Sequence, residues 1–121
     1  RLVRKLCTKC RKERPFNEEE KKLITNLGEK YGVKFDLSGK TYDAVGCKHC
    51  NNTGYYDRIG IFEILNITDE IKEEIMNGKS SLEIRKKALE QDYKPLLIDG
   101  IGKVIKGLTT IDELNKKLLF Y

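Results

Sequence analysis

Four cysteines in two C-x-x-C pairs, Cys7 with Cys10 and Cys47 with Cys50, offer the clearest chemistry in this sequence. A C-x-x-C turn can aim two thiolates at one point, and two such turns supply the four sulfur ligands of a tetrahedral Zn²⁺ site. A site of this kind has a closed coordination shell and leaves no position for a catalytic water. The spacing therefore predicts one structural zinc site with four cysteine ligands.

Three alternatives to zinc stay open at this point. Two disulfides would suit an oxidising compartment, but no signal peptide is visible. A single iron ion would accept the same four sulfurs. Redox catalysis needs one activated thiolate, and two matched pairs argue against it. His49 lies inside the second pair, and a solvent-facing place in the turn fits it better than ligation, because four sulfurs already complete the shell.

Basic residues crowd the first cysteine pair. Positive charge beside thiolates lowers their pKa and offsets the negative charge of the site, but the same charge could also bind an acidic partner. The sequence favours neither role over the other. The residues concerned are Arg1, Arg4, Lys5, Lys9, Arg11, Lys12 and Arg14.

The composition is that of a soluble domain with a modest core. The 121 residues are 36% charged and 39% hydrophobic, and no apolar run is long enough to cross a membrane. The formal charge is +5, and ionised thiolates around zinc would add about −2. The charges are otherwise interleaved, which favours a solvated surface over a nucleic-acid stripe. No phosphate-binding loop or Ser-His-Asp set is present, so this chain alone is not expected to be an enzyme.

The segment between the cysteine pairs is predicted to be a helix followed by a short hairpin. Asn17 caps a helix that runs to about Tyr31, and Glu20 completes a capping box with it. Extended pieces at 33–35 and 42–45 follow, with a turn between them. Residues 7–50 would then form a metal-pinned subdomain.

An apolar strand over residues 59–65 is followed by helices at 68–77, 80–91, 95–106 and 109–119. The two tight helix corners could belong to a DNA-binding helix-turn-helix, but acidic residues at the helix starts would meet phosphates. A packed helical bundle is the better interpretation. We expect an α+β fold, mostly α, with a tetracysteine subdomain at 1–54 and a strand plus helical subdomain at 55–121.

Several strings in this sequence resemble the ATPases of type II secretion and type IV pilus assembly. Residues 45–63, V-G-C-K-H-C-N-N-T-G-Y-Y-D-R-I-G-I-F-E, resemble that family's G-C-x-x-C-x-x-T-G-Y-x-x-R-x-G-I-x-E. The opening R-L-V-R-K-L-C is similar to its R-L-V-R-x-L-C-x-x-C. Residues 83–85, 99–100 and 107–113 resemble its final helices. One departure is Asp57, where the family often has glycine before the arginine.

The resemblance implies the C-terminal domain of a hexameric ATPase at the cytoplasmic face of the inner membrane. The upstream nucleotide-binding domain would hold ATP and Mg²⁺, and Cys7, Cys10, Cys47 and Cys50 would bind one zinc ion. Partners would be that upstream domain, neighbouring subunits and inner-membrane assembly proteins. Arg58 becomes a candidate nucleotide sensor, although a surface ion pair with Asp57 or Glu63 explains it equally well.

A freestanding zinc-stabilised nucleic-acid binder is the alternative function. Basic residues near Cys7 would contact the backbone, and Tyr55 and Tyr56 would stack on bases. The sequence does not distinguish secretion from pilus assembly or DNA uptake.

Overall fold

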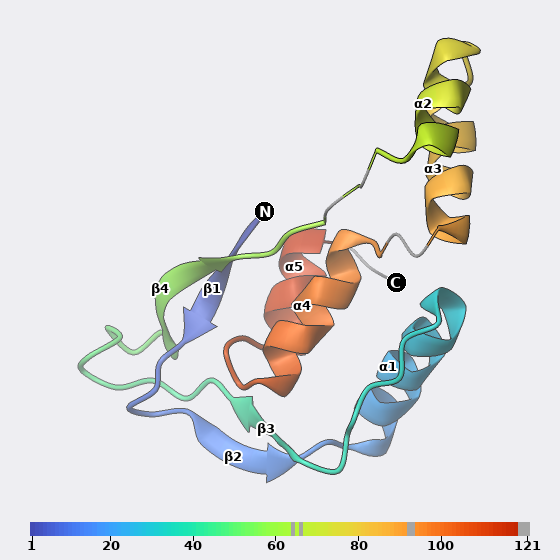
Figure 1. The fold of residues 1–121 in the computed structure, drawn as a ribbon. Coiled ribbons are helices and arrows are strands. Elements are labelled where there is room, and N and C mark those ends of the chain that lie inside the picture. The colour runs from blue at the N-terminus through green and yellow to red at the C-terminus, as the bar shows by residue number, and fades with distance from the viewer. Residues whose placement is uncertain (64, 66, 92–93, 119–121) are drawn as a thin grey trace. The chain divides into compact units, whose positions relative to one another are not determined.

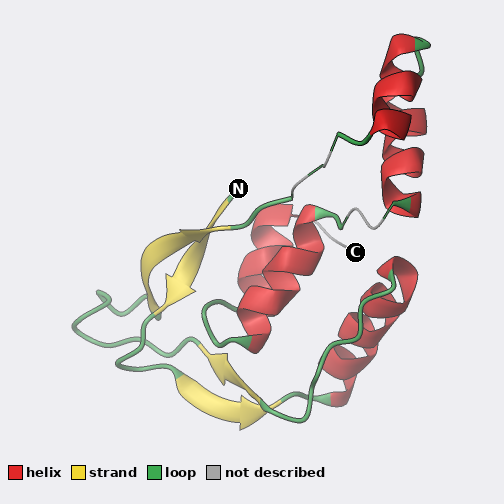
Figure 2. Cartoon of the chain, in the orientation of Figure 1, coloured by secondary structure: helices red, strands yellow, loops and turns green. Residues whose placement is uncertain are grey.

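The computed structural model describes residues 1–63, 65, 67–91 and 94–118. It divides into two compact units, one formed by residues 1–62 together with the chain from Leu96 onward, and one formed by residues 63–95. The described residues form two small antiparallel sheets and five helices (Figures 1 and 2). The expected α+β class, with more helix than strand, is confirmed.

Two strand pairs organise the first unit. Strand β1 (Leu2–Leu6) pairs with β4 (Tyr55–Gly60), and β2 (Lys12–Pro15) pairs with β3 (Lys40–Asp43), both antiparallel. The β1–β4 register shifts between Arg4 and Leu6, which marks a bulge next to the first cysteine. Both pairs join segments that are distant in the sequence, as Figure 1 shows.

The structure does not contain the hairpin that was predicted between residues 33–35 and 42–45. Residues 33–35 are not a strand, because the chain leaves the helix through a bond of 2.8 Å from the Val33 N–H to the Gly28 carbonyl. The partner of β3 is β2, a segment for which no strand was expected. Arg14 fixes the arrangement, since it contacts Glu20 at 2.6 Å and Asp43 at 2.8 Å.

The strand expected at 59–65 lies earlier, at Tyr55–Gly60. The Ile61 N–H still bonds to the Arg1 carbonyl at 2.7 Å, but the Phe62 N–H bonds instead to the side chain of Asp99 at 2.9 Å. That bond takes the chain away from the sheet, so the remaining apolar residues do not extend the strand. Residue 64 lies outside the described residues.

The helices begin where the capping residues predict. Helix α1 (Glu18–Tyr31) has a complete capping box between Asn17 and Glu20, and Gly32 ends it in the left-handed conformation. Thr68 caps α2 (Asp69–Met76) and Ser80 caps α3 (Ser81–Glu90). Helix α4 spans Leu96–Ile105 and α5 spans Ile111–Leu118. Residue 119, where the last helix was expected to end, lies outside the described part.

The core of the first unit lies where α1, α4 and α5 meet the β1–β4 pair. Its buried apolar members come from β1, the residue after β4, the approach to α1, and the three helices. Helices α4 and α5 approach closely at Gly100, where a methyl group would lie 2.8 Å from Leu114. The buried cluster consists of Val3, Phe16, Ile24, Ile61, Ile101, Val104 and Leu114. No helix in the described ranges combines the length and apolarity needed to span a bilayer.

Gly28 and Gly102 make a matched pair for testing this packing. Both are helical, but a methyl group at Gly28 would lie 2.3 Å from the Val33 carbonyl oxygen, whereas one at Gly102 meets nothing within 4 Å. We expect Gly28→Ala to lower the free energy of unfolding by about 1–3 kcal/mol, because the clash exceeds the gain in helix propensity. Gly102→Ala should raise it by up to about 1 kcal/mol. Denaturant titration measures both, and equal effects would contradict the packing described here.

Candidate metal centre

The four cysteine sulfurs converge on one point. Their Sγ atoms all lie within 4.8 Å of one another. The distance is 3.8 Å between Cys7 and Cys47, 3.8 Å between Cys10 and Cys50, and 3.7 Å between Cys47 and Cys50. The structure therefore brings together the four residues that the spacing singled out.

The two strand pairs position this cluster. The first C-x-x-C turn joins the end of β1 to the start of β2, and the second joins β3 to β4. Because β1 pairs with β4 and β2 with β3, both turns must lie at the same end of the molecule. The Cys7 N–H also bonds to the Gly54 carbonyl at 3.0 Å, which ties the two turns directly.

The backbone of the second C-x-x-C turn adopts conformations that only a few residue types favour. Gly54 has a φ of +83°, and a methyl group there would lie 2.7 Å from the Ala44 side chain. Asn51 and Asn52 have φ values of 54° and 62°, and asparagine tolerates this left-handed region better than most residues. The two asparagines and Gly54 therefore suit the backbone conformation of this turn.

Backbone N–H groups point at the sulfurs. Those of Cys47 and Gly54 each donate to Cys50 Sγ at 3.2 Å, and that of Gly46 donates to Cys10 Sγ at 3.3 Å. Burial opposes ionisation of Cys50, but these donors prevail and lower its pKa to about 6. Burial raises the pKa of Cys10 to about 11. The cluster thus has at least one sulfur prepared to be a thiolate ligand.

The donor set fits zinc. Four sulfurs at about 2.3 Å from a tetrahedral ion lie about 3.8 Å apart, which matches the three contacts above. A disulfide needs about 2.05 Å, so these contacts are not S–S bonds, and all four cysteines are free thiols. The same geometry would accept a single iron ion. His49 is exposed and stacks on Tyr56, with ring centroids 4.2 Å apart, rather than joining the sulfurs.

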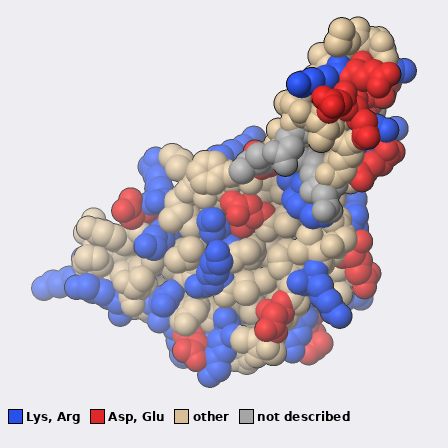
Figure 3. Space-filling model, in the orientation of Figure 1, with Lys and Arg blue, Asp and Glu red and all other residues tan. Residues whose placement is uncertain are grey.

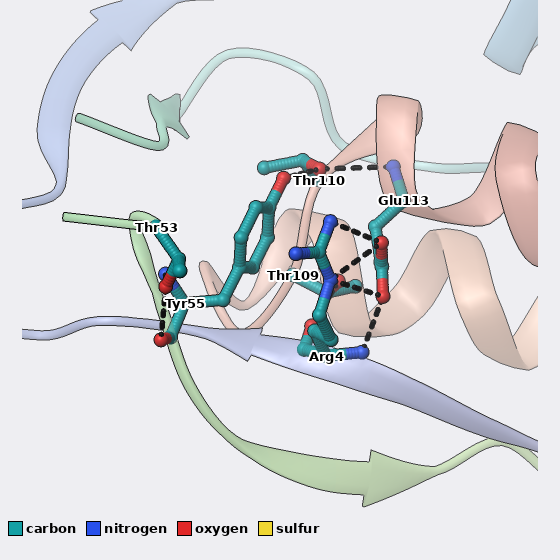
Figure 4. Close-up of polar contacts among 6 residues, drawn as sticks. All are labelled: Arg4, Thr53, Tyr55, Thr109, Thr110 and Glu113. Atoms are coloured by element: carbon teal, nitrogen blue, oxygen red, sulfur yellow. Dashed lines mark hydrogen bonds and ion pairs between the residues drawn. The ribbon is translucent and has the colours of Figure 1, made fainter. Parts of the chain in front are cut away.

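An ion pair that involves a buried carboxylate, next to the cluster, was not expected from the sequence. Glu113 in α5 has no exposed surface, and its carboxylate accepts the Arg4 backbone N–H at 2.6 Å and the Arg4 guanidinium at 3.1 Å (Figure 4). Thr109 donates to the Arg4 carbonyl at 2.8 Å. The pair thereby fixes α5 to the strand that leads into Cys7. Its only sequence signal was Thr110 three residues before Glu113, the pattern of a helix cap.

Tyr55 continues this network toward the second cysteine turn. The Arg4 guanidinium lies 4.2 Å above its ring, and its hydroxyl is 2.8 Å from Thr110 Oγ1. Thr53 bonds to the carbonyls of both Cys50 and Tyr55. Figure 4 shows these side chains in one continuous chain from the turn to α5. Tyr55 is thus a structural residue.

Arg58 lies on β4, opposite Arg4 in the strand pairing, and its side chain is exposed. Its backbone N–H bonds to the Asp57 carboxylate at 2.9 Å, and Asp57 itself has a φ of 70°. This is the position at which the sequence departs from the family pattern, and within β4 the aspartate side chain accepts that bond where the backbone is left-handed. The Arg58 side chain forms no ion pair with any residue that the structure describes.

Fold and cluster together define a small α+β module built around four converging cysteines. The family model described as "Type II/IV secretion system protein" matches residues 1–116. The chain therefore belongs to this family.

Curated relatives agree with that assignment. The chain is 36% identical over 115 residues to a type IV pilus assembly ATPase PilB of Thermus thermophilus, covering 94% of the chain and 12% of that relative. It is 37% identical to the PilB of Pseudomonas aeruginosa, covering 96% and 19%. Type II secretion system protein E of Aeromonas hydrophila is 36% identical, with 94% and 21% covered. The chain thus spans about a fifth or less of the length of these relatives.

Proposed function

We propose that this chain is the C-terminal zinc-binding module of a hexameric secretion or pilus-assembly ATPase. In this proposal it passes ATP-driven domain motion to neighbouring subunits or to inner-membrane assembly proteins, at the cytoplasmic face of the membrane. The convergence of four sulfurs at tetrahedral spacing is the observation on which the proposal depends. Family membership supports the connection to the motor. ATP and Mg²⁺ would bind upstream, and this chain would not catalyse hydrolysis by itself.

The module's role would be that of a stiff lever. When bound, a zinc ion would cross-link the two turns and supply no reaction chemistry. Arg4 and Glu113 tie the first turn's strand to α5, and Arg11 donates to the Gly107 carbonyl at 2.6 Å. A displacement of α5 would therefore be transmitted to the cysteine end, because these contacts hold the two parts together rigidly. We propose residues 1–54 as the metal subdomain and 55–121 as its continuation toward the motor.

Arg58 is proposed as a residue that senses nucleotide in the whole protein. Its support is its exposed position on β4 and the absence of an ion pair among the described residues. A guanidinium without an acidic partner is available for a phosphate. Asp57 holds the local backbone rather than neutralising this charge.

The full-length protein tests these proposals in one experiment. With both Cys47 and Cys50 changed to serine, we expect bound zinc to be lost and pilus assembly or secretion to fail, while nucleotide binding persists. Arg58→Ala should retain zinc but lower the ATPase rate. Thr8→Ser, a change at an exposed position inside the first turn, should alter neither. Normal assembly by the zinc-free variant would refute the lever, and an unchanged ATPase rate would remove Arg58 from the mechanism.

The nucleic-acid alternative has less support. Tyr55 is engaged with Arg4 and Thr110, and the ring of Tyr56, although half exposed, already stacks on His49. A gel shift at low salt decides the matter, because contacts to phosphates weaken steeply as salt rises. Retardation there that disappears at high salt would favour this function over the proposed one.

A further inference from the structure

The cysteine end of the first unit carries positive charge that the fold leaves unneutralised. The arginines there serve structural contacts, with Arg4 on Glu113 and Arg14 on Glu20 and Asp43. The remaining basic residues are different, since none of them forms an ion pair within the described ranges. These zinc-end cations are Lys5, Lys9, Lys12 and Lys48. Asp57 is the one acidic residue in the segments 1–12 and 44–60 that hold them.

An aromatic platform lies among these cations. Tyr56 is 52% exposed, although its ring stacks on His49. Val45, two residues before Cys47, is 57% exposed. Exposed aromatic and aliphatic side chains surrounded by charge have the composition of a protein interface, with an apolar centre and a polar rim. A surface that bound only through phosphate charge would not need this apolar centre.

The α2–α3 hairpin has the opposite character. Residues 63–95 hold eight acidic and six basic residues, whereas the rest of the chain holds eleven acidic and eighteen basic ones. Four carboxylates of α2 form no ion pair with any described residue. Helical spacing places two of them, Asp69 and Glu73, opposite buried Ile71. The four are Asp69, Glu70, Glu73 and Glu74, and Figure 3 shows the acidic atoms gathered over this part of the chain.

The hairpin also exposes apolar side chains next to its carboxylates. Met76 is 85% exposed and Ile75 is 50% exposed, both in the last turn of α2. A thioether packs well against aromatic rings and adapts to irregular surfaces. The hairpin therefore offers negative charge opposite in sign to the zinc-end cations, together with the exposed side chains of Ile75 and Met76 to cover an aromatic ring.

We propose that the cysteine end of one copy docks on the α2–α3 hairpin of a second copy. The zinc-end cations pair with the α2 carboxylates, and Tyr56 packs against Met76. Such a contact joins two different surfaces of the same chain, which is the head-to-tail type of interface that closes rings. The inference rests on the proposed function in one respect, since it assumes that a bound metal holds the cysteine end rigid.

Isotope-coded cross-linking of the zinc-loaded chain tests the contact. Equal amounts of ¹⁴N and ¹⁵N protein are mixed at low salt and treated with a carbodiimide, which joins a lysine amine to a carboxylate only where the two touch. We expect peptides that link Lys9 or Lys48 to Glu70 or Glu73, with hybrid ¹⁴N–¹⁵N products as abundant as the two like-isotope products together. Their yield should fall as salt rises.

Charge reversal supplies the controls. Lys9→Glu with Lys48→Glu should lower the association constant, measured by sedimentation, at least about tenfold. Glu70→Lys with Glu73→Lys should do the same, and an equimolar mixture of the two reversed proteins should associate again. Lys22→Glu with Lys34→Glu, at exposed positions away from the cysteines, should have no such effect.

Four outcomes would overturn the proposal. Like-isotope products alone would place the contact within one chain, and no cross-link between these segments would mean that they do not meet. Failure of the mixed reversed proteins to associate would show that the charges do not pair across copies. Metal content is measured on every sample, so a zinc-loaded chain that does not associate rejects this contact and leaves the lever intact. A chain without zinc counts against the proposed function instead.

Discussion

Replacing Cys50 with serine is expected to abolish stoichiometric zinc binding and to lower the free energy of unfolding by several kcal/mol, on the order expected for a structural site. Cys50 is 4% exposed and accepts two backbone N–H bonds, so its sulfur lies inside the turn rather than at its surface. A serine hydroxyl keeps the size but does not ionise near neutral pH. The second turn would then lose both its metal and its charge-assisted bonds.

Elemental analysis and denaturant titration measure this effect, with Thr8→Ser as the control in the same kind of turn. The control should stay within about 0.5 kcal/mol of the parent. A chelator added to the unmodified chain should reproduce the loss of stability. Acid should do the same, because the ligands must be deprotonated to bind and zinc affinity falls as pH falls. Full zinc content in the serine variant would contradict the assignment of Cys50 as a ligand.

The sequence was sufficient for features that short spacings determine. Each C-x-x-C pair is a local turn, and the helix starts follow from single capping residues such as Asn17 and Ser80. These features depend on neighbours within four residues, so no knowledge of the fold is required. The family resemblance then placed these local features in order along the whole chain.

The sequence did not predict which segments pair with each other over long distances along the chain. The partner of β3 is β2, whose sequence K-E-R-P gives no strand signal. This strand is held by the ion pairs of Arg14 and by that of Lys40 with Glu13 at 2.8 Å. The contact between Arg4 and Glu113 spans 109 positions. In the sequence, Arg4 was one of several basic residues near a predicted metal site, and Glu113 was an acidic residue at the start of a helix. Each position had an adequate local explanation. Only the fold shows that the two residues form an ion pair with each other.

Substitutions in the Arg4–Glu113 pair should give the second large change in the free energy of unfolding. The change should be larger for the loss of the Arg4 side chain than for the loss of the Glu113 charge. Arg4→Met leaves a carboxylate with no exposed surface and one remaining donor, the Arg4 backbone N–H. We expect this change to lower the free energy of unfolding by about 3–5 kcal/mol, as for a broken buried pair. Glu113→Gln leaves a guanidinium whose side chain is 38% exposed and already solvated. Its cost should be only about 1–2 kcal/mol.

The pH dependence follows from the same contact. Burial acts to raise the pKa of Glu113, but the hydrogen bonds and charge of Arg4 outweigh it, so the folded-state pKa lies below its ordinary value. The carboxylate therefore stabilises the fold above the unfolded pKa of about 4.3. That contribution is lost as the pH falls through the lower folded value. Denaturant titrations from neutral to acidic pH should show this loss in the parent chain and a smaller one in Glu113→Gln.

Lys5→Met is the matched control, since Lys5 is the neighbour of Arg4 on β1 and has no ion pair among the described residues. It should change the stability by no more than about 0.5 kcal/mol. Equal costs for Arg4→Met and Lys5→Met would mean that Glu113 finds other donors or takes up a proton without penalty. In that event β1 would not be fixed to α5 by this pair, and the cysteine end would need a different connection to the helices that move it.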